Sequence, residues 1–374
     1  MSTARLIIAD SEKNANLYYA TRFLAPDSFV FIQLGQRKIL IMSDLEVDRA
    51  KSQAKVDEVL SFTHLAQQLK KQGNSAPGMM DVIDGFFKEK GIKDIEVPSD
   101  FAVIYADALR KRGYAVHPKP EPFYPERMIK SEEEIAWLTE SLRITEDALA
   151  MAIELIRNSE IHADNTLWLG AKPLTVELVR KSMHLTMMER DCVAQHTIVA
   201  PGIQAVDPHN EGSGPLRAHE PIVMDVFPQH AQTRYFADIT RTVVKGKASD
   251  KVRRMFDAVK HGQDIAYKII REGVDGATVH EAILAYFEEQ GFKTGEINGR
   301  MQGFFHGTGH GVGIEIHEPP RVSAKADILK AGMVVTVEPG LYYEDAGGIR
   351  IEDMIVVTKD GCRLLNKAPK ILEV

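Results

Sequence analysis

The sequence is poor in cysteine, with Cys192 and Cys362 as the only two among 374 residues. Two cysteines cannot build the disulfide framework of a small secreted domain. Their separation does not fit a thiolate zinc site either, because such sites use closely spaced cysteine pairs. We therefore expect two buried thiols in the reduced state.

Long apolar runs and an excess of positive charge are also missing. No apolar segment approaches the roughly 20 residues that a membrane-spanning helix needs. Residues 1–14 contain no long apolar core followed by a small-residue cleavage site, so we identify no secretory signal. The net charge is −7, whereas a nucleic-acid-binding domain usually presents a basic face. These absences argue against membrane and nucleic-acid partners and predict a soluble, cytoplasmic protein.

The length and composition fit a globular protein of two domains. Short strand-like and helical segments alternate over the first 120 residues. A segment with prolines at 118, 120, 122 and 125 follows, and such a segment favours a stiff, extended chain. A proline-rich loop inside one domain is the alternative, but the pattern changes after it. We predict a smaller α/β domain over 1–120, a linker over 121–130 and a second domain over 131–374.

The second domain combines capped helices with strand-like runs. Ser131 and Glu134 form a capping box that opens a long amphipathic helix, and Thr278 and Glu281 form a second such box. The strand-like runs span 196–200, 221–227, 235–244, 333–337 and 349–358. Because helices and hairpin-like strands occupy separate blocks, we expect the α+β class for this domain.

Acidic residues interrupt these apolar runs. They are Asp225, Asp238, Glu338 and Glu352, and His310 lies in a glycine-rich stretch over 306–317. A buried carboxylate is costly unless it is paired or bound to a metal. Each residue alone could be a salt-bridged acid or a packing histidine. Together they form a mainly hard-oxygen set that suits one or two divalent cations such as Mn²⁺, Co²⁺, Fe²⁺ or Zn²⁺.

Three motifs carry a resemblance to a known family. They are His306-Gly-Thr-Gly-His310-Gly-Val-Gly-Ile-Glu-Ile-His317-Glu, Val337-Glu338-Pro-Gly340 and Gly348-Ile-Arg-Ile-Glu352. Together they resemble the pita-bread metallopeptidases of family M24, which include methionine aminopeptidase, aminopeptidase P and prolidase. The resemblance covers 126–374, and the preceding domain resembles that of the creatinase, aminopeptidase P and prolidase branch. It implies a C-terminal pita-bread domain after a smaller creatinase-type domain, and a homodimer.

The resemblance also implies a ligand set for two divalent metal ions, with Mn²⁺ the first expectation and Co²⁺, Zn²⁺ or Fe²⁺ the alternatives. The implied ligands are Asp225, Asp238, His310, Glu338 and Glu352. Because all five are present, the set disfavours creatinase-like amidinohydrolase activity and disfavours the metal-free relatives that act as binding proteins.

One departure concerns the two aspartates. Asp225 and Asp238 are 13 residues apart, where the family usually has 11, and Phe227 stands where a glycine is common. If the extra residues lie in a hairpin turn after Pro228, both aspartates can still share one face. If they lie within a strand, a bulge would re-aim one ligand.

A two-metal site can deprotonate a bridging water near neutral pH, and the hydroxide then attacks the peptide carbonyl. The resemblance assigns substrate contacts and transition-state stabilisation to His209 and His317. It gives His306 a supporting or substrate-binding place, and makes Glu338 the proton shuttle as well as a ligand. These four residues are the candidate catalytic set.

The two-domain branch of the family is known for cleaving Xaa-Pro bonds, so we expect small peptides with proline at the second position as substrates. Arg321 resembles the arginine with which microbial prolidases can hold the free carboxylate of a C-terminal proline, and a surface arginine in a proline-rich turn is the alternative. Arg350 is a second candidate for substrate binding, or it pairs with a carboxylate ligand. We predict a prolidase. Aminopeptidase P and a non-catalytic binding protein, which only the longer Asp225–Asp238 interval supports, are the alternatives.

Overall fold

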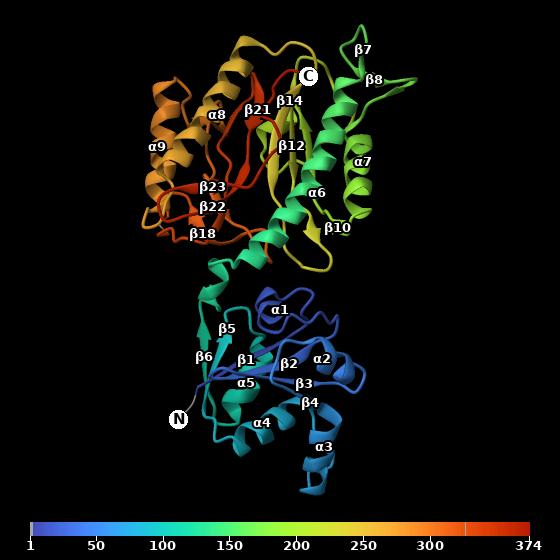
Figure 1. Ribbon diagram of the computed structural model, residues 1–374, viewed down its shortest axis with the longest axis vertical. Coiled ribbons are helices and arrows are strands. Elements are labelled where there is room, and N and C mark those ends of the chain that lie inside the picture. The colour runs from blue at the N-terminus through green and yellow to red at the C-terminus, as the bar shows by residue number, and fades with distance from the viewer. Residues whose placement is uncertain (1–2, 326) are drawn as a thin grey trace. The chain divides into compact units, whose positions relative to one another are not determined.

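The computed structural model describes residues 3–325 and 327–374 (Figure 1). The chain divides into two compact units, Met1–Arg127 and Met128–Val374. This division falls inside the segment 121–130, for which a linker is predicted.

A six-stranded sheet in the order β4-β3-β2-β1-β5-β6 forms the centre of the first unit. Its strands are β1 (Ala4–Ala9), β2 (Phe29–Leu34), β3 (Arg37–Met42), β4 (Glu58–Ser61), β5 (Asp94–Pro98) and β6 (Ala115–Lys119). Its helices are α1 (Ala15–Thr21), α2 (Val47–Gln53), α3 (Phe62–Lys71), α4 (Met79–Glu89) and α5 (Val103–Lys111), and the 3-10 helix η1 spans Pro125–Met128.

The sheet of the first unit has a hydrophobic core on each face. Leu6 and Ile8 of β1 belong to the core that also contains residues of α3, α4 and α5. Ile7, between them, belongs to the core formed with α1 and α2. This alternation is the period of two expected of a strand buried on both faces. The first unit is therefore a three-layer α/β structure.

The proline-rich segment is extended, as expected, but it packs more closely than a free linker would. Its first part forms β6, which pairs in parallel with β5. Phe123 and Tyr124 are buried in the core of the first unit. Residues up to Tyr124 therefore contribute to that core.

The second unit holds the remaining elements. Its helices are α6 (Glu132–Arg157), α7 (Val176–Met188), α8 (Asp250–Ile269) and α9 (Gly276–Glu289), with the 3-10 helix η2 (Gly202–Val206). Its strands are β7 (Glu160–Ile161), β8 (Leu167–Leu169), β9 (Lys172–Pro173), β10 (Cys192–Val193), β11 (Ile198–Pro201), β12 (Pro221–Val226), β13 (Gln229–His230), β14 (Ile239–Val244), β15 (Gly295–Ile297), β16 (Arg300–Gln302), β17 (Gly309–Gly311), β18 (Glu318–Val322), β19 (Val334–Val337), β20 (Gly340–Tyr343), β21 (Gly347–Arg350), β22 (Asp353–Val357) and β23 (Cys362–Leu364).

Two antiparallel sheets organise this unit, in the orders β11-β12-β14 and β18-β17-β19-β22-β23. Figure 1 shows the strands between two helix pairs, with α6 and α7 on one side and α8 and α9 on the other. One hydrophobic core of the unit joins residues of α8 and α9 to those of β19, β21 and β22. This arrangement places helices outside and sheets inside, as an α+β domain requires.

One of the two predicted capping boxes is confirmed. The Ser131 Oγ accepts from the Glu134 amide at 3.2 Å, and the Glu134 carboxylate accepts from the Ser131 amide at 2.9 Å. The second prediction is wrong, because α9 begins at Gly276 and Asp275 is its N-cap. An aspartate accepts the first amide hydrogen bonds as well as a threonine does, so the earlier residue caps the helix.

The expectation that all four acids interrupt strands is also wrong. Asp225 lies inside β12, but Asp238 precedes β14 and Glu338 follows β19. The predicted strand 349–358 divides into β21 and β22, with Glu352 directly before β22. Where a strand ends, the backbone leaves the ladder, and side chains of different sheets can converge on one point.

The structure bears on the expectations about the two cysteines and about membrane-spanning helices. Cys192 is buried and Cys362 is partly buried, and both are free thiols. Among the helices of the described residues, none is both long enough and apolar enough to cross a membrane.

Candidate metal centre and active site

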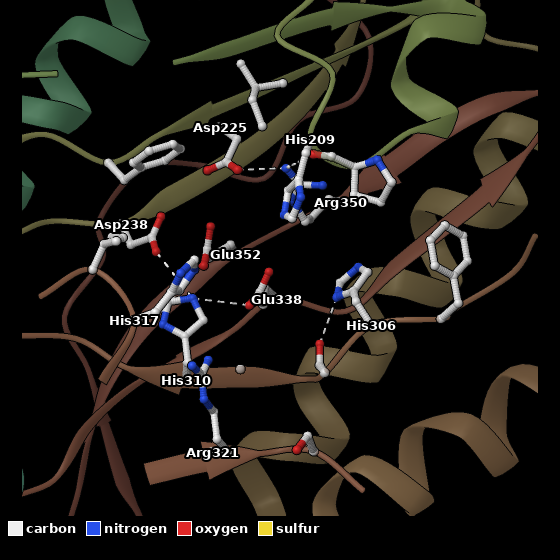
Figure 2. A pocket seen from close by; sticks show the side chains of 18 of the residues that line it. His209, Asp225, Asp238, His306, His310, His317, Arg321, Glu338, Arg350 and Glu352 are labelled. Atoms are coloured by element: carbon white, nitrogen blue, oxygen red, sulfur yellow. Dashed lines mark hydrogen bonds and ion pairs between the residues drawn. The ribbon is translucent and has the colours of Figure 1, made fainter. Parts of the chain in front are cut away.

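The ten predicted site residues line one cavity of the second unit (Figure 2). Its volume is about 650 Å³. The predicted residues in its wall are His209, Asp225, Asp238, His306, His310, His317, Arg321, Glu338, Arg350 and Glu352. Residues that are up to 143 positions apart in the sequence, such as His209 and Glu352, thus meet in one place.

The aspartates share one face because the β12–β14 ladder is regular. Asp225 pairs with Thr240 and Val226 with Ile239, and the register continues without a shift to Pro221 and Val244. Residues that pair across a ladder share one face, so Asp225 and Thr240 point to the same side, and Asp238, directly before β14, lines the same cavity. The extra residues lie in the connection 227–238, where β13 pairs with β10 instead. The longer interval is therefore a longer hairpin connection, and no bulge re-aims Asp238.

Glycines allow β17 to bring His310 into the cavity. A Cβ at Gly309 would lie 1.9 Å from the carbonyl oxygen of Thr336, and one at Gly311 would lie 2.4 Å from that of Pro319. Only glycine fits where the neighbouring backbones approach this closely. The His310 Nδ1–H donates to the Gly311 carbonyl at 3.2 Å. This bond leaves Nε2 directed at the carboxylates, as Figure 2 shows.

The structure contains a buried cluster suited to a cation. Asp238, His310 and Glu352 each offer one ligand atom, and these atoms lie within 4.8 Å of one another. The His310 Nε2 is 3.6 Å from Asp238 Oδ2 and 3.4 Å from Glu338 Oε1. Asp225 Oδ1 is buried and has no hydrogen-bond partner among the described residues. An orphaned carboxylate oxygen beside a buried acid cluster fits a divalent ion with oxygen ligands.

Burial and mutual repulsion shift the acids of this cluster in the same direction. Burial, followed by the charges of Glu352 and Asp225, raises the pKa of Asp238 well above its usual value. The pKa of Glu352 is raised by burial and by Glu338, and burial raises the pKa of Glu338 to about 8. Burial lowers the pKa of His310 to about 3, so its imidazole is neutral and can act as a ligand. A bound cation would reverse the repulsion among these carboxylates.

A chain of hydrogen bonds links Arg350 to His306. The Arg350 guanidinium donates to the Tyr342 hydroxyl at 2.9 Å, and that hydroxyl lies 2.8 Å from His306 Nε2. The other ring nitrogen of His306 donates to the Gly307 carbonyl at 2.8 Å. Both nitrogens are therefore used within the protein. These bonds fit the supporting place that the resemblance implies for His306, which also lines the cavity.

Arg350 pairs with a candidate ligand, which was the second interpretation of its role. Its Nη2 lies 2.7 Å from Asp225 Oδ2, and the side chains of both residues are nearly buried. The same guanidinium donates to Thr240 Oγ1 at 3.3 Å and to the Pro208 carbonyl at 3.4 Å. Arg350 thus orients Asp225 and holds the loop that carries His209.

The remaining predicted residues lie where the cavity opens. His209 follows η2 and is exposed, and His317 is exposed in the turn before β18. The rings of His317 and His310 are perpendicular, with centroids 4.3 Å apart. Arg321 of β18 pairs in register with His310. Within residues 3–325 and 327–374 its guanidinium has no ion-pair partner, so it is available to an anionic ligand.

Sequence reasoning missed Thr240 and Tyr342. The Thr240 Oγ1 donates to Glu352 Oε2 at 2.8 Å and so orients that carboxylate. Its position two residues after Asp238 on one strand face could have indicated it. Tyr342 lies in β20, four residues after Glu338. No local sequence pattern distinguishes it from an ordinary core tyrosine.

Residues 136–359 match the sequence profile of metallopeptidase family M24. The chain belongs to this family, and it is a hydrolase of the metallopeptidase class. Metallopeptidases act through divalent metal ions, and the acid and histidine cluster fits that requirement.

The relatives indicate the branch of the family. The chain is 29% identical over 365 residues to the Xaa-Pro dipeptidase of Pyrococcus horikoshii, covering 96% of this chain and 92% of the relative. The structure of the Xaa-Pro dipeptidase from Bacillus anthracis superposes with a TM-score of 0.83 at 25% identity, covering 100% and 95% of the two chains. An X-Pro aminopeptidase from Thermotoga maritima gives a TM-score of 0.81 at 25% identity, covering 100% and 98%. The expected pita-bread fold and the prolidase and aminopeptidase P branch are confirmed.

Proposed function

We propose that this protein is a binuclear metallopeptidase that hydrolyses the Xaa-Pro bond of dipeptides. The observation that carries the proposal is the meeting of five ligand-type side chains in one cavity with Arg321, which has no ion-pair partner among the described residues. Relatives over nearly the full length of the chain bear the name Xaa-Pro dipeptidase, which supports the same substrate class.

In this proposal the two metal ions are held by Asp225, Asp238, His310, Glu338 and Glu352, and Mn²⁺ is our first choice. A carboxylate-rich site with one imidazole suits Mn²⁺, although Co²⁺, Zn²⁺ or Fe²⁺ could occupy the same ligands. When bound, such ions polarise the peptide carbonyl and lower the pKa of a coordinated water.

The protein's own residues supply the proton transfers and the orientation. The Glu338 carboxylate lines the cavity among the other acids, so it can accept a proton from the attacking water and pass it to the leaving proline nitrogen. That nitrogen carries no hydrogen in the substrate, because proline lacks a backbone N–H. His317 and His209, at the opening of the cavity, are placed to donate hydrogen bonds to the oxyanion that develops on the carbonyl.

Arg321 is the basis for preferring a dipeptidase over an aminopeptidase. We propose that its guanidinium binds the free carboxylate of a C-terminal proline through a bidentate contact. A longer peptide has no carboxylate at this position, so it would lose that interaction. One solved neighbour is an X-Pro aminopeptidase, which keeps aminopeptidase P as the second candidate.

A non-catalytic binding protein is not favoured. The longer Asp225–Asp238 interval was its only support, and those extra residues lie in the connection outside the β12–β14 ladder. We also propose a homodimer, which the mass in solution would test, and a cytoplasmic location, with which two free thiols agree.

The decisive measurement is product release from Ala-Pro and Ala-Pro-Ala by the Mn²⁺-loaded protein, with Asp238→Ala as the control. Preferential cleavage of the dipeptide, lost in the variant, would support the dipeptidase. Preferential cleavage of the tripeptide would indicate aminopeptidase P and remove the role of Arg321. If neither peptide is cleaved with Mn²⁺ or Co²⁺, the proposal is wrong.

A further inference from the structure

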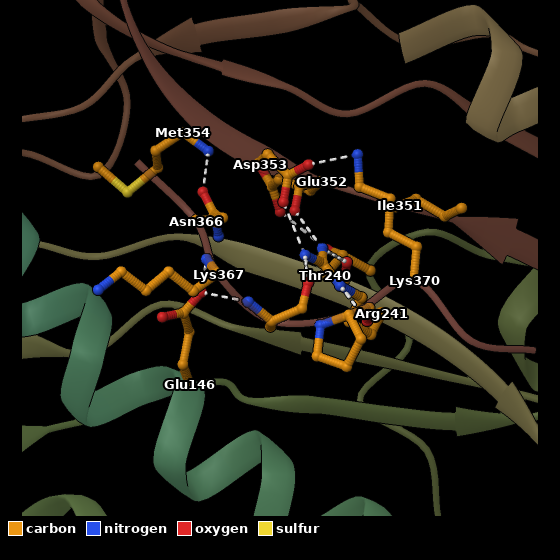
Figure 3. A network of polar contacts seen from close by, with 12 residues as sticks. Glu146, Thr240, Arg241, Ile351, Glu352, Asp353, Met354, Asn366, Lys367 and Lys370 are labelled. Atoms are coloured by element: carbon orange, nitrogen blue, oxygen red, sulfur yellow. Dashed lines mark hydrogen bonds and ion pairs between the residues drawn. The ribbon is translucent and has the colours of Figure 1, made fainter. Parts of the chain in front are cut away.

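A buried polar network lies behind the metal centre, on the opposite face of the β12–β14 ladder (Figure 3). Arg241 is its centre, and only 2% of this residue is exposed. Thr240 and Thr242 flank it in the sequence and point to the side of the cavity, so the alternation of the strand directs Arg241 away from the cavity. The network has no place in the proposed reaction.

The guanidinium of Arg241 holds the two backbone positions that meet in the metal centre. Its Nη1 donates to the carbonyl of Glu352 at 2.7 Å and to that of Thr240 at 2.9 Å. The Glu352 amide also donates to the Thr240 carbonyl at 3.0 Å. On the cavity side, the Thr240 hydroxyl donates to the Glu352 carboxylate. Thr240 and Glu352 are thus joined on both faces, and Arg241 supplies the bonds of the far face.

Asp353 compensates the charge of Arg241. It is fully buried, and its Oδ1 lies 2.7 Å from the Arg241 guanidinium. Its Oδ2 lies 2.7 Å from Lys370 Nζ and accepts from the Tyr267 hydroxyl at 2.8 Å. Because Asp353 follows Glu352 directly, the ion pair also restrains the backbone on the other side of that ligand.

The segment 365–370 completes the network. Arg241 donates to the carbonyls of Ala368 and Pro369, at 2.8 and 3.2 Å. Glu146 of α6 accepts from the amides of Lys367 and Ala368, at 2.5 and 2.7 Å. The Arg241 guanidinium therefore donates to four backbone carbonyls, of Thr240, Glu352, Ala368 and Pro369, and to the Asp353 carboxylate.

We propose that Arg241 is a positioning residue for the metal centre, which sets metal affinity by fixing the backbone of Thr240 and Glu352. The inference rests on the metal site in the proposed function. Groups that orient metal ligands without touching the metal typically change affinity by about 10- to 100-fold when they are replaced. Lysine at this position keeps the charge opposite Asp353, but its single ammonium lacks the fork that bonds several carbonyls at once.

The test measures Mn²⁺ affinity by isothermal titration calorimetry and the thermal unfolding of the metal-free protein. Arg241→Lys should retain most of the thermal stability and weaken Mn²⁺ binding by about 10-fold or more. Arg253→Met is the matched control, because the ion pairs of Arg253 are with Asp250 and Glu373 and involve neither Thr240 nor Glu352, and it should leave the affinity unchanged. If Arg241→Lys lowers only the stability, or changes neither quantity, the inference is overturned.

A double variant tests the route through Glu352. In the Glu352→Gln background, Arg241→Lys should cause little further loss of Mn²⁺ affinity, because the ligand that it positions is already impaired. A full, additive loss would overturn the inference. If the wild-type protein binds Mn²⁺ but cleaves no Xaa-Pro peptide, only the proposed function fails, whereas absence of Mn²⁺ binding would remove both.

Discussion

Burial favours the neutral forms of several ionisable side chains in the cavity, both acids and histidines. Glu338 has a pKa near 8 because burial opposes its ionised form. His310 and His306 have pKa values lowered to about 3, since burial opposes the cationic imidazole. The metal-free centre is therefore a set of partly protonated acids around neutral histidines, and a divalent ion must displace protons in order to bind.

Metal affinity should consequently increase with pH between about 6 and 8. At pH 6 Glu338 is protonated, and its proton must leave when the ion binds, so binding releases protons and weakens as the pH falls. Calorimetry in buffers of different ionisation enthalpy measures this release directly. Glu338→Gln should reduce the released protons, and an affinity that stays constant over this range would contradict the expectation.

The guanidinium of Arg321 permits a prediction on substrate length. Arg321→Ala should raise KM for Ala-Pro about 10-fold or more and leave KM for Ala-Pro-Ala nearly unchanged, because only the dipeptide places a carboxylate at this position. Steady-state kinetics of both peptides measure the difference. Equal effects on the two substrates would contradict the carboxylate role, and Arg300→Ala, at a surface ion pair of another sheet, is the control.

At the scale of elements, the loop 312–317 is held at both of its ends. The connection between the aspartates contributes the Phe236 amide, which donates to Gly313, and the Gln229 side chain, which donates to Ile314 at 3.2 Å. At the other end, Glu318 forms an ion pair of 2.6 Å with Lys130, the residue just before the α6 cap. The longer connection thus helps to shape the loop that presents His317.

Breaking the Lys130–Glu318 pair should therefore impair stability and catalysis together. Both side chains are at most 4% exposed, and removing one partner of a buried pair typically costs about 3–5 kcal/mol. Lys130→Met should lower the free energy of unfolding by roughly that amount and reduce kcat. Chemical denaturation and peptide kinetics measure the two effects.

The double variant Lys130→Met, Glu318→Leu is the control for that prediction. It removes both buried charges, so it should recover much of the lost stability. Recovery of stability without recovery of kcat would indicate that the pair orients His317. A single variant as stable as the wild type would contradict the structural role of the pair.

At the scale of the whole molecule, the chain consists of two units with separate cores, and the candidate metal centre lies in the second. The stability of the metal-free second unit should depend on pH. The Glu338 pKa is raised from 4.5 to about 8, so protonated Glu338 stabilises the folded state at acidic pH. This stabilisation is lost as the pH rises from 4.5 toward 8. The pKa of His310 is lowered from 6.5 to about 3, so neutral His310 stabilises the folded state above pH 6.5. This stabilisation is lost as the pH falls below 6.5 toward 3.

Metal removal should consequently destabilise the second unit most at alkaline pH. At a free Mn²⁺ concentration of 100 Kd, binding stabilises the folded state by about 2.7 kcal/mol, and chelation removes this contribution. Hydrogen exchange with mass spectrometry, at pH 8 with Mn²⁺ or with a chelator, should show lost protection in β12, β14, β19 and β22. Unchanged protection in these strands would contradict a metal centre at this place.

The sequence by itself determined the chemistry and much of the local structure. The glycine-rich histidine motif and the acids near strand ends identify the family, and Ser131 caps α6 because a capping box is a local interaction. The N-cap of α9 shows the limit of such patterns, because both Asp275 and Thr278 are suitable capping residues and the helix begins after Asp275.

Tertiary structure alone decided which of these groups meet. Arg241 and Asp353 are 112 residues apart, and Lys130 and Glu318 are 188 apart, so no sequence period relates them. Tyr342 bridges Arg350 to His306 only because β20 and β21 pair as neighbours. The acids acquire raised pKa values for the same reason: burial and the approach of like charges are properties of the folded chain, and they do not exist before the sheets assemble.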